Sequence, residues 1–430
     1  MTDGPRIAVI GGGWAGMAAA SKLAAEGTCV DVFEAGRVLG GRARRVEIDG
    51  MALDNGLHLL LGAYTDTLAC LERVGAPAAA FLRTPLRLDT VHGFRLDCPP
   101  IPAPWHLLAG LLGARGIGWS DRLAAARLMQ RAKRDQYRCA GQITVTALLD
   151  AHRQPRRLRE ALWHPLCIAA LNTPPDVADA QVFLHVLRDG LAGSRHASDL
   201  VFPTVDLSAM FPEPAADFVI ARGGSVHLGE AVSAVDGDGP FTIRTARRTA
   251  SYAQVICAVD PARLAPLLRD LPALSDVGAR AAALRHAPIV SVYLDYGIDV
   301  RLRSPMIGLG DGPGEWVFDR QQLCGQRGWL GVVISASDRW TGTPHAMLTR
   351  QVEGQLAAQL AMPPAAQRTR VIVEKRATFL CTPGADRPTQ RTALPGFHLA
   401  GDYTASDYPA TLEAAVRSGL ACAQAVLENT

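Results

Sequence analysis

The sequence predicts an α/β protein with a parallel-sheet, dinucleotide-binding domain and a mixed α+β second domain that has a helical cap. Three observations predict this class. Residues 6–34 follow the order strand, glycine turn, helix and strand. Strand patterns with glycine turns return from residue 218 and again near residue 397. A helical region with many prolines and several β-branched runs separate them, and 430 residues suffice for two or three domains.

The first unit carries a nucleotide-binding glycine pattern. A short buried strand is expected at 6–10, and Gly11, Gly13 and Gly16 follow it at G-x-G-x-x-G spacing. Gly11 permits a tight turn, Gly13 lets a pyrophosphate approach the backbone, and Gly16 lets the helix pack closely on the strand. The order of the elements makes this a dinucleotide site rather than a chance match.

Two further features of this unit define the nucleotide. The glycines open a helix, whose free N–H groups and positive dipole end are expected to bind the phosphates, and Trp14 and Ala15, between Gly13 and Gly16, are assigned to the cofactor with them. A second strand at 30–33 ends in Glu34, followed by Ala35. An acid at this position accepts hydrogen bonds from the ribose hydroxyls and disfavours a 2′-phosphate, so NADP is not expected.

A second glycine pair separates flavin from nicotinamide. Gly40, Gly41 and Arg42 follow the unit at once, and they fit a backbone turn with a guanidinium that reaches the same pyrophosphate. This stretch resembles the start of the flavin-containing amine oxidase and phytoene desaturase superfamily. The resemblance implies bound FAD and a Rossmann-like domain of the GR2 type.

A segment with two glycines near residue 60 extends the resemblance. Gly56, Leu57 and His58 belong to a string, Gly56 to Tyr64, that is similar to the plant and cyanobacterial type of phytoene desaturase. The resemblance implies a position near the isoalloxazine. For His58 two roles stay open, a hydrogen-bonded structural histidine and a donor of a proton to substrate.

The C-terminal residues match the second flavin motif of the superfamily. A strand is expected at 397–400, then Gly401 and Asp402, a loop, and a helix beginning near Pro409. By resemblance, Asp402 touches the ribityl and pyrophosphate region. The helix start at Thr411 and Leu412 directs its N–H groups at flavin N1 and O2, where negative charge forms on reduction.

The remaining assignments to the cofactor domain rest on the resemblance alone. It places Val232 where its backbone binds the adenine, and Ala258 near the dinucleotide where the chain leaves the domain. The expected FAD-binding domain is discontinuous and comprises 1–85, 205–285 and 385–430. The expected substrate domain comprises 86–204 and 286–384.

Bulk composition restricts the partners. The net charge of +3 gives no reason to expect nucleic acid, and no stretch reaches the roughly 20 apolar residues of a spanning helix. Nine scattered cysteines, with no C-x-x-C pair, fit a reduced cytoplasmic compartment. No cleavable signal and no metal site are predicted.

The region after residue 98 has two interpretations. The proline-rich stretch 99–104 leads into the apolar, tryptophan-flanked segment Trp105–Trp119 and then into a basic helix. This pattern is typical of peripheral contact with the inner face of the cytoplasmic membrane. It equally fits an ordinary helical cap with a solvated basic face.

Two apolar, proline-containing segments, 163–175 and 200–212, fit either a lipophilic tunnel or plain core. They resemble the desaturase and hydroxysqualene dehydroxylase group, and their amino-acid sequences are most similar to those of the dehydroxylases. The resemblance implies reductive removal of an allylic hydroxyl from an isoprenoid lipid to give squalene, as in hopanoid biosynthesis. Because hydroxide is a poor leaving group, an acid is needed, and the candidates are His58, Asp407 and Tyr408.

The electron source leaves alternatives open. The sequence has one dinucleotide fingerprint, so a soluble reduced nicotinamide or a partner protein must reduce the flavin. The lack of a second dinucleotide fingerprint also suits an oxidative, phytoene-type desaturase that passes its electrons to a membrane quinone. An amine oxidase is less favoured, because the only aromatic pair near the flavin motif is Tyr403 and Tyr408. A prenyl-lipid carrier without flavin is disfavoured by the intact glycine motif.

Overall fold

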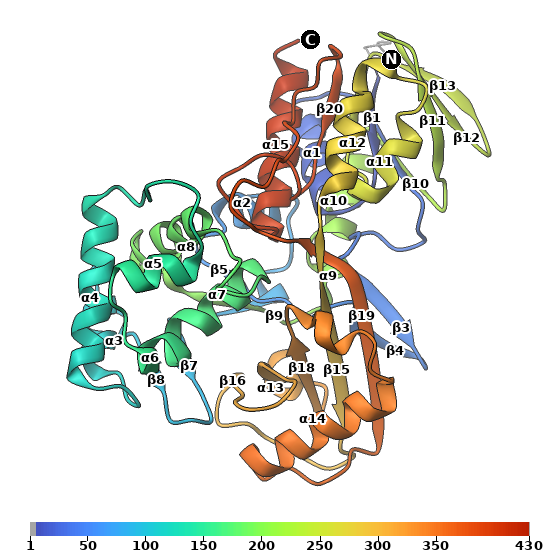
Figure 1. The fold of residues 1–430 in the computed structure, drawn as a ribbon. Coiled ribbons are helices and arrows are strands. Elements are labelled where there is room, and N and C mark those ends of the chain that lie inside the picture. The colour runs from blue at the N-terminus through green and yellow to red at the C-terminus, as the bar shows by residue number, and fades with distance from the viewer. Residues whose placement is uncertain (1–5, 430) are drawn as a thin grey trace.

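The computed structural model describes residues 6–429 and contains three parts (Figure 1). A region built on a parallel sheet holds both chain ends, a second region is built on an antiparallel sheet, and a lobe of short helices lies beside them.

The first sheet has five parallel strands taken from distant parts of the chain. Their spatial order is β10 (Ser225–Leu228), β2 (Val30–Glu34), β1 (Ile7–Ile10), β14 (Gln254–Cys257) and β20 (Phe397–Leu399). All residues of β1 and β14 are buried, as expected for central strands covered on both faces.

Alternating residues of these strands contact two different layers. Ile7 and Val9 pack with helices on one face, whereas Ala8 and Ile10 pack toward the other. The helical face carries α1 (Trp14–Ala25), α10 (Pro212–Ile220) and α15 (Leu412–Leu427). The other face carries the meander β11 (Val232–Asp236), β12 (Phe241–Thr245) and β13 (Thr249–Tyr252), together with α11 (Pro261–Leu267) and α12 (Ser275–Ala283).

The second sheet is antiparallel and also has five strands. Their order is β16 (Met306–Gly308), β17 (Trp316–Asp319), β18 (Trp329–Ile334), β15 (His286–Asp295) and β19 (Arg368–Phe379). Helix α14 (His345–Leu360) covers one face through Leu348, Val352 and Leu356. The short helix α13 (Arg320–Cys324) follows β17.

The helical lobe lies between β8 and β9 in the sequence. It comprises α3 (Trp105–Gly113), α4 (Trp119–Arg134), α5 (Val145–Ala151), α6 (Arg156–Leu158), α7 (His164–Leu171) and α8 (Ala180–Leu191). Trp163 and Phe183 are fully buried in its core. The smaller elements are β3 (Arg45–Ile48), β4 (Met51–Asp54), β5 (Leu60–Leu61), α2 (Thr65–Arg73), β6 (Phe81–Thr84), β7 (Arg87–Asp89), β8 (Arg95–Asp97), β9 (Leu200–Pro203) and α9 (Leu207–Met210).

The predicted α/β class, with a parallel nucleotide-binding sheet and a mixed second part, is confirmed. The last helix, expected to begin near Pro409 and to present N–H groups at Thr411 and Leu412, is α15, which begins at Leu412 with Thr411 as its cap. Ala253 separates β13 from β14, and residues 307–308 lie in β16. The domain limits at 85, 205, 285 and 385 stay a prediction.

Candidate active site

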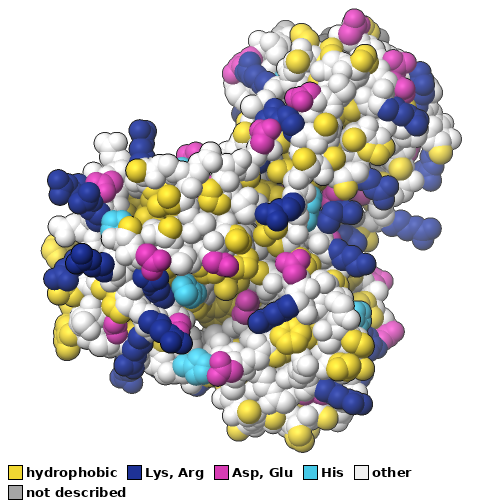
Figure 2. All heavy atoms as spheres, viewed as in Figure 1, with side chains coloured by type: hydrophobic (Ala, Val, Ile, Leu, Met, Phe, Trp, Pro, Cys, Tyr) yellow, Lys and Arg dark blue, Asp and Glu magenta, His cyan; other side chains and the backbone are white. Residues whose placement is uncertain are grey.

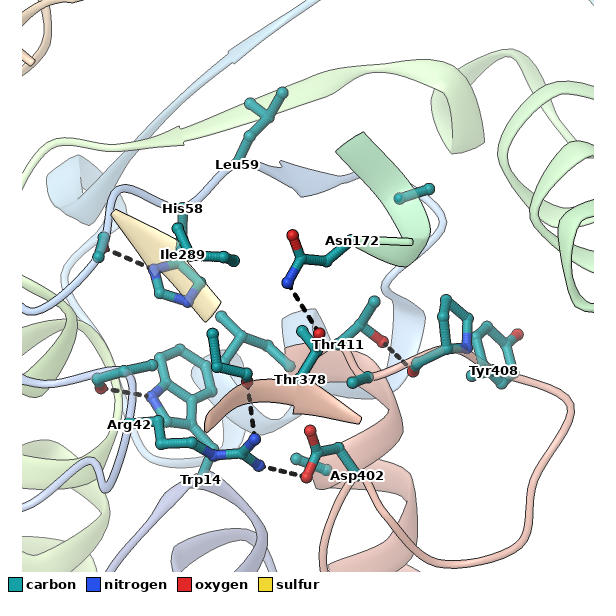
Figure 3. Close-up of a pocket in the computed structure, with 18 of the residues that line it drawn as sticks. Trp14, Arg42, His58, Leu59, Asn172, Ile289, Thr378, Asp402, Tyr408 and Thr411 are labelled. Carbon is teal, nitrogen blue, oxygen red and sulfur yellow. Dashed lines mark hydrogen bonds and ion pairs between the residues drawn. The ribbon is translucent and has the colours of Figure 1, made fainter. Parts of the chain in front are cut away.

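A cavity of about 1250 Å³ lies where the parallel sheet, the second sheet and the helical lobe meet. Ordinary small-molecule pockets measure roughly 300–1,000 Å³, so this cavity has room for more than one molecule. Its lining includes every residue that the sequence assigned to the cofactor except Gly16. The close-up in Figure 3 shows part of it.

The glycine turn leaves space where a pyrophosphate would lie. Gly11 has φ +108°, and a Cβ there would lie 2.5 Å from the carbonyl oxygen of Ala258. A Cβ on Gly16 would lie 1.9 Å from the carbonyl oxygen of Gly11, so Gly16 allows α1 to pack on the turn and does not face the cavity. Gly13 precedes α1, and no side chain caps that helix. The first N–H groups of α1 therefore stay available to an anion.

Glu34 is held rigidly at the end of β2. Its Oε2 accepts a hydrogen bond from the Gly12 N–H at 2.7 Å, and its Oε1 accepts one from the Gly36 N–H at 2.6 Å. These bonds leave further lone pairs on a carboxylate that lines the cavity beside Ala35. The arrangement fits recognition of ribose hydroxyls.

Arg42 joins three segments of the chain at the cavity wall. Its guanidinium donates to the Ala377 carbonyl at 2.7 Å and pairs with Asp402 (Figure 3). Gly40, with φ +118°, and Gly41 form the turn that precedes it, and both line the cavity. A guanidinium has five N–H donors, so it can keep these partners and still bind a phosphate oxygen.

The start of α15 forms another part of the wall. Thr411 caps the helix by accepting the Ala414 N–H at 3.1 Å, and Thr411 and Leu412 line the cavity. The acid in the first turn, Glu413, is directed away, because it accepts the backbone N–H groups of Asp66 and Thr67. The positive end of this helix dipole therefore faces the cavity without a carboxylate beside it.

His58 lies on the opposite wall and is neutral in its ordinary state. Its Nδ1 is 2.7 Å from the Gly56 carbonyl, which can only accept, so Nδ1 carries the hydrogen. Burial lowers the pKa of His58, with a smaller lowering contribution from Arg42 that opposes the effect of the Gly56 bond. Its Nε2 is left for a molecule in the cavity.

The other two candidate acids have different surroundings. Tyr408 lines the cavity, but its hydroxyl donates to Asp189 at 2.7 Å, and burial followed by this bond raises the pKa of Tyr408. Asp407 does not line the cavity. Its mainly exposed carboxylate lies near His185 and Arg188, about 4 Å from each. In this structure Asp407 is not placed to protonate a molecule in the cavity.

Val232 and Ala258 line the cavity from β11 and from the end of β14. The Ala258 N–H donates to the Ile10 carbonyl at 2.7 Å, which fixes the chain beside the glycine turn. The backbone contact of Val232 with adenine stays a prediction.

Several lining residues were not found from the sequence. Asn172 ends α7 in the left-handed region, with φ 46°. Its amide donates to Thr378 Oγ1 at 2.9 Å and accepts the Ala336 N–H at 2.6 Å. Figure 3 shows Asn172, His58, Ile289 and Thr378 around the same part of the cavity. No helix end was predicted here from the sequence, and the one available signal was an asparagine followed by Thr173 and two prolines, because asparagine tolerates the left-handed backbone at which helices end.

The part of the cavity inside the helical lobe is apolar. The lobe contributes Leu107, Leu111, Met129, Leu162 and Leu166, and the adjoining segment 86–94 contributes Leu86, Leu88 and Phe94. Trp163, Leu166 and Asn172 bring segment 163–175 into the lining, so this segment serves as cavity wall as well as core. In residues 6–429, no cluster of side chains suited to a metal ion is present, and no helix is long and apolar enough to cross a membrane.

Comparison with known proteins agrees with this geometry. The family described as flavin-containing amine oxidoreductases matches residues 14–427. A hydroxysqualene dehydroxylase of Rhodopseudomonas palustris is 29% identical over 98% of both chains. A 15-cis-phytoene desaturase of Synechococcus elongatus is 26% identical over 98% of this chain and 96% of its own. The structure of cyclohexylamine oxidase from Brevibacterium oxydans superimposes with a TM-score of 0.71 at 16% identity, covering 99% of each chain.

Proposed function

We propose, on the premise that this chain belongs to the flavin-containing amine oxidoreductase family, that it reduces hydroxysqualene to squalene. FAD is the cofactor of the family. The residues present fit it, because an uncapped helix start, a cradle of glycines and the fixed carboxylate of Glu34 converge on one cavity. When bound and reduced, FAD supplies a hydride.

The observation that carries the substrate proposal is the apolar arm that continues from the dinucleotide end of the cavity. An isoprenoid chain buries well among Leu107, Leu111 and Leu166, and this burial is worth about 25 cal/mol per Å² of apolar surface. An amine substrate would need a free carboxylate or an aromatic cage. Each carboxylate at the cavity wall is paired or hydrogen-bonded within the chain, namely Glu34, Asp189, Asp260, Glu374 and Asp402. Tyr403 is buried, and the hydroxyl of Tyr408 is bound to Asp189. The arm therefore favours a hydrocarbon.

The chemistry replaces one C–O bond with one C–H bond. The carbon receives a hydride, and the hydroxyl leaves with one proton as water, so the chain must provide that proton or relay it. We assign this role to His58. It lines the cavity, and its Nε2 makes no hydrogen bond within the described residues. Its Nδ1 bond to Gly56 orients the ring, and Nε2 carries the proton to be donated when the imidazole is charged.

Asn172 and Thr378 are proposed to orient the substrate hydroxyl. They lie where the apolar arm meets the dinucleotide end, and their mutual hydrogen bond fixes both side chains. The surrounding apolar wall excludes water, which strengthens hydrogen bonds to the leaving oxygen.

A phytoene-type desaturation is the second candidate. It is favoured by the apolar lining of the arm and by the relative from Synechococcus elongatus. This reaction would remove two hydrogens from a hydrocarbon and pass two electrons to an acceptor. It needs no proton for a leaving hydroxyl, so replacement of His58 would affect it less.

The two candidates are separated by product mass. Full-length, FAD-loaded protein is chemically reduced without oxygen and incubated with hydroxysqualene, and oxidised protein is incubated with phytoene and a quinone. We expect a product lacking one oxygen atom from hydroxysqualene and unchanged phytoene. Loss of two hydrogens from phytoene, with hydroxysqualene untouched, would replace the proposal by the second candidate. A protein that purifies without flavin absorbance would overturn both.

A further inference from the structure

The exposed face of α4 changes character along the helix. Trp119, Leu123, Arg127 and Arg131 follow one another at four-residue spacing, so their side chains lie along one face. Trp119 is 70% exposed, and Arg122 stacks over its ring with a distance of 4.5 Å to the centroid. The face is therefore apolar in its first half and cationic in its second half.

Helix α3 adds a second apolar surface next to this face. Trp105, Leu108 and Leu112 are exposed, and Trp105 is 61% exposed. Leu107 and Leu111, on the other side of the same helix, line the cavity. One helix thus separates an exposed apolar surface from the apolar arm. Exposed large hydrophobic side chains that cluster in this way mark a binding surface.

A basic cleft of about 700 Å³ lies between the cationic half of α4 and the end of α5. Its lining includes four arginines, Arg127, Arg131, Arg134 and Arg153, together with His152. In the part of the chain that the structure describes, the guanidinium groups of Arg127, Arg134 and Arg153 make no hydrogen bond or ion pair. Arg131 pairs with Asp135, but the other three arginines have no counter-charge within residues 6–429. Unpaired cations gathered around a concave surface form a site for an anion.

The nearby acids are already engaged. Asp121 caps α4 by accepting the Gly118 N–H, Asp135 pairs with Arg131, and Asp150 pairs with Arg159. They leave the cleft positively charged. Figure 2 shows Lys and Arg side chains clustered along the edge of the molecule where Figure 1 places α4.

We propose that the cleft lined by Arg127, Arg131, Arg134 and Arg153 binds the phosphate of an anionic phospholipid, while Trp105, Leu112 and Trp119 insert into the bilayer surface. A lipid is favoured over a soluble phosphate ester because the cationic and apolar parts share one helix face. Tryptophan at the level of the headgroups, with arginine binding their phosphates, is the chemistry of a helix lying in a membrane interface.

The proposed membrane contact does not depend on the proposed function. Only the identity of the substrate that would enter the cavity from the membrane rests on it. Docking by α3 and α4 would bring the wall formed by Leu107 and Leu111 close to the acyl chains, where a squalene-like hydrocarbon dissolves. The apolar arm would then receive its substrate without passage through water.

Vesicle binding tests the phosphate site. Full-length, FAD-loaded protein is sedimented with vesicles of phosphatidylcholine alone or with added phosphatidylglycerol. We expect binding to the anionic vesicles that the triple variant Arg127→Gln, Arg134→Gln, Arg153→Gln weakens about 100-fold. The matched control Arg301→Gln, Arg327→Gln, Arg350→Gln removes the same charge from the second-sheet region and should bind as the parent does. Equal weakening by both triples would overturn the proposed site.

Two further experiments identify the ligand. The variant Trp105→Ser, Trp119→Ser should lose vesicle binding while its flavin absorbance, which reports folding, is retained. Glycerol phosphate is titrated as the soluble probe. The lipid assignment would be overturned if the parent protein bound glycerol phosphate but no vesicles, and if the cleft variant lost the binding of glycerol phosphate. The cleft would then be a site for a soluble phosphate. These assays contain no hydroxysqualene, so their failure is distinct from failure of the proposed reaction.

Discussion

At the scale of single residues, His58 gives the proposed reaction its pH dependence. Burial lowers the pKa of His58 below the ordinary value near 6.5, so the charged, proton-donating form is scarce at neutral pH. If His58 donates the proton, the rate of substrate reduction must rise as pH falls through this lowered pKa and must level off below it. The variant His58→Asn should be slower by about 10²–10⁴-fold and independent of pH in this range.

Single-turnover kinetics from pH 5 to 8 check this expectation, with Asp407→Asn as the matched control. Asp407 lies outside the cavity, so its replacement should leave both the rate and the pH profile unchanged. His58 would be excluded as the proton donor if the rate of the parent protein did not depend on pH, or if the same pH dependence remained in His58→Asn.

The residues predicted from sequence are those whose role is local. Gly11, Gly13 and Glu34 belong to one strand–turn–helix–strand unit, so their spacing alone places them around one site. Asn172 and Thr378 come together only because the residue that ends α7 lies beside β19, an arrangement that no local sequence pattern encodes. The structure places the Asp407 carboxylate near His185 and Arg188 instead of at the cavity. Its closeness to a flavin motif in sequence did not determine which way its side chain points.

At the scale of elements, the helix pair α1 and α15 decides how the two chain ends meet. Gly419 lies on the face of α15 that contacts α1, and a Cβ there would lie 2.1 Å from the Ala15 carbonyl oxygen. No sequence pattern assigns a role to Gly419, because its requirement arises only from contact with a helix some 400 residues earlier. The contact keeps Thr411 and Leu412 beside the glycine turn.

Replacement Gly419→Ala should therefore separate these helices, destabilise the protein by about 1–3 kcal/mol and weaken FAD binding. Gly354→Ala is the matched control, since Gly354 also lies within a helix but a Cβ there meets nothing within 4 Å. This control should keep or slightly raise the stability, as alanine is the better helix former. Thermal unfolding and flavin titration compare the two, and equal behaviour would contradict the packing role of Gly419.

At the scale of the whole molecule, the fold is discontinuous and its segments converge on one ligand. The parallel sheet takes strands from the first 34 residues, from 225–257 and from 397–399, and β15 and β19 connect it with the second sheet. The class of fold was predictable, because each strand of the parallel sheet has a local signal. The order of the strands was not predictable in this way, because the sequence of a strand does not indicate which distant strand it pairs with.

This architecture predicts that FAD binding stabilises the entire chain. Residues of the cavity wall come from both termini and from the middle, so removal of the cofactor leaves the α1 helix start and the paired Arg42 and Asp402 without the ligand that joins them. A ligand that binds only the folded state stabilises it by ~4 kcal/mol at a thousandfold excess over its Kd. The apoprotein should therefore unfold at a lower temperature, and added FAD should restore the parent value. Riboflavin, which lacks the pyrophosphate and adenosine, should restore much less, because the glycine turn and Glu34 would remain without partners. Equal stabilisation by riboflavin and FAD would show that the dinucleotide end of the cavity contributes nothing to binding.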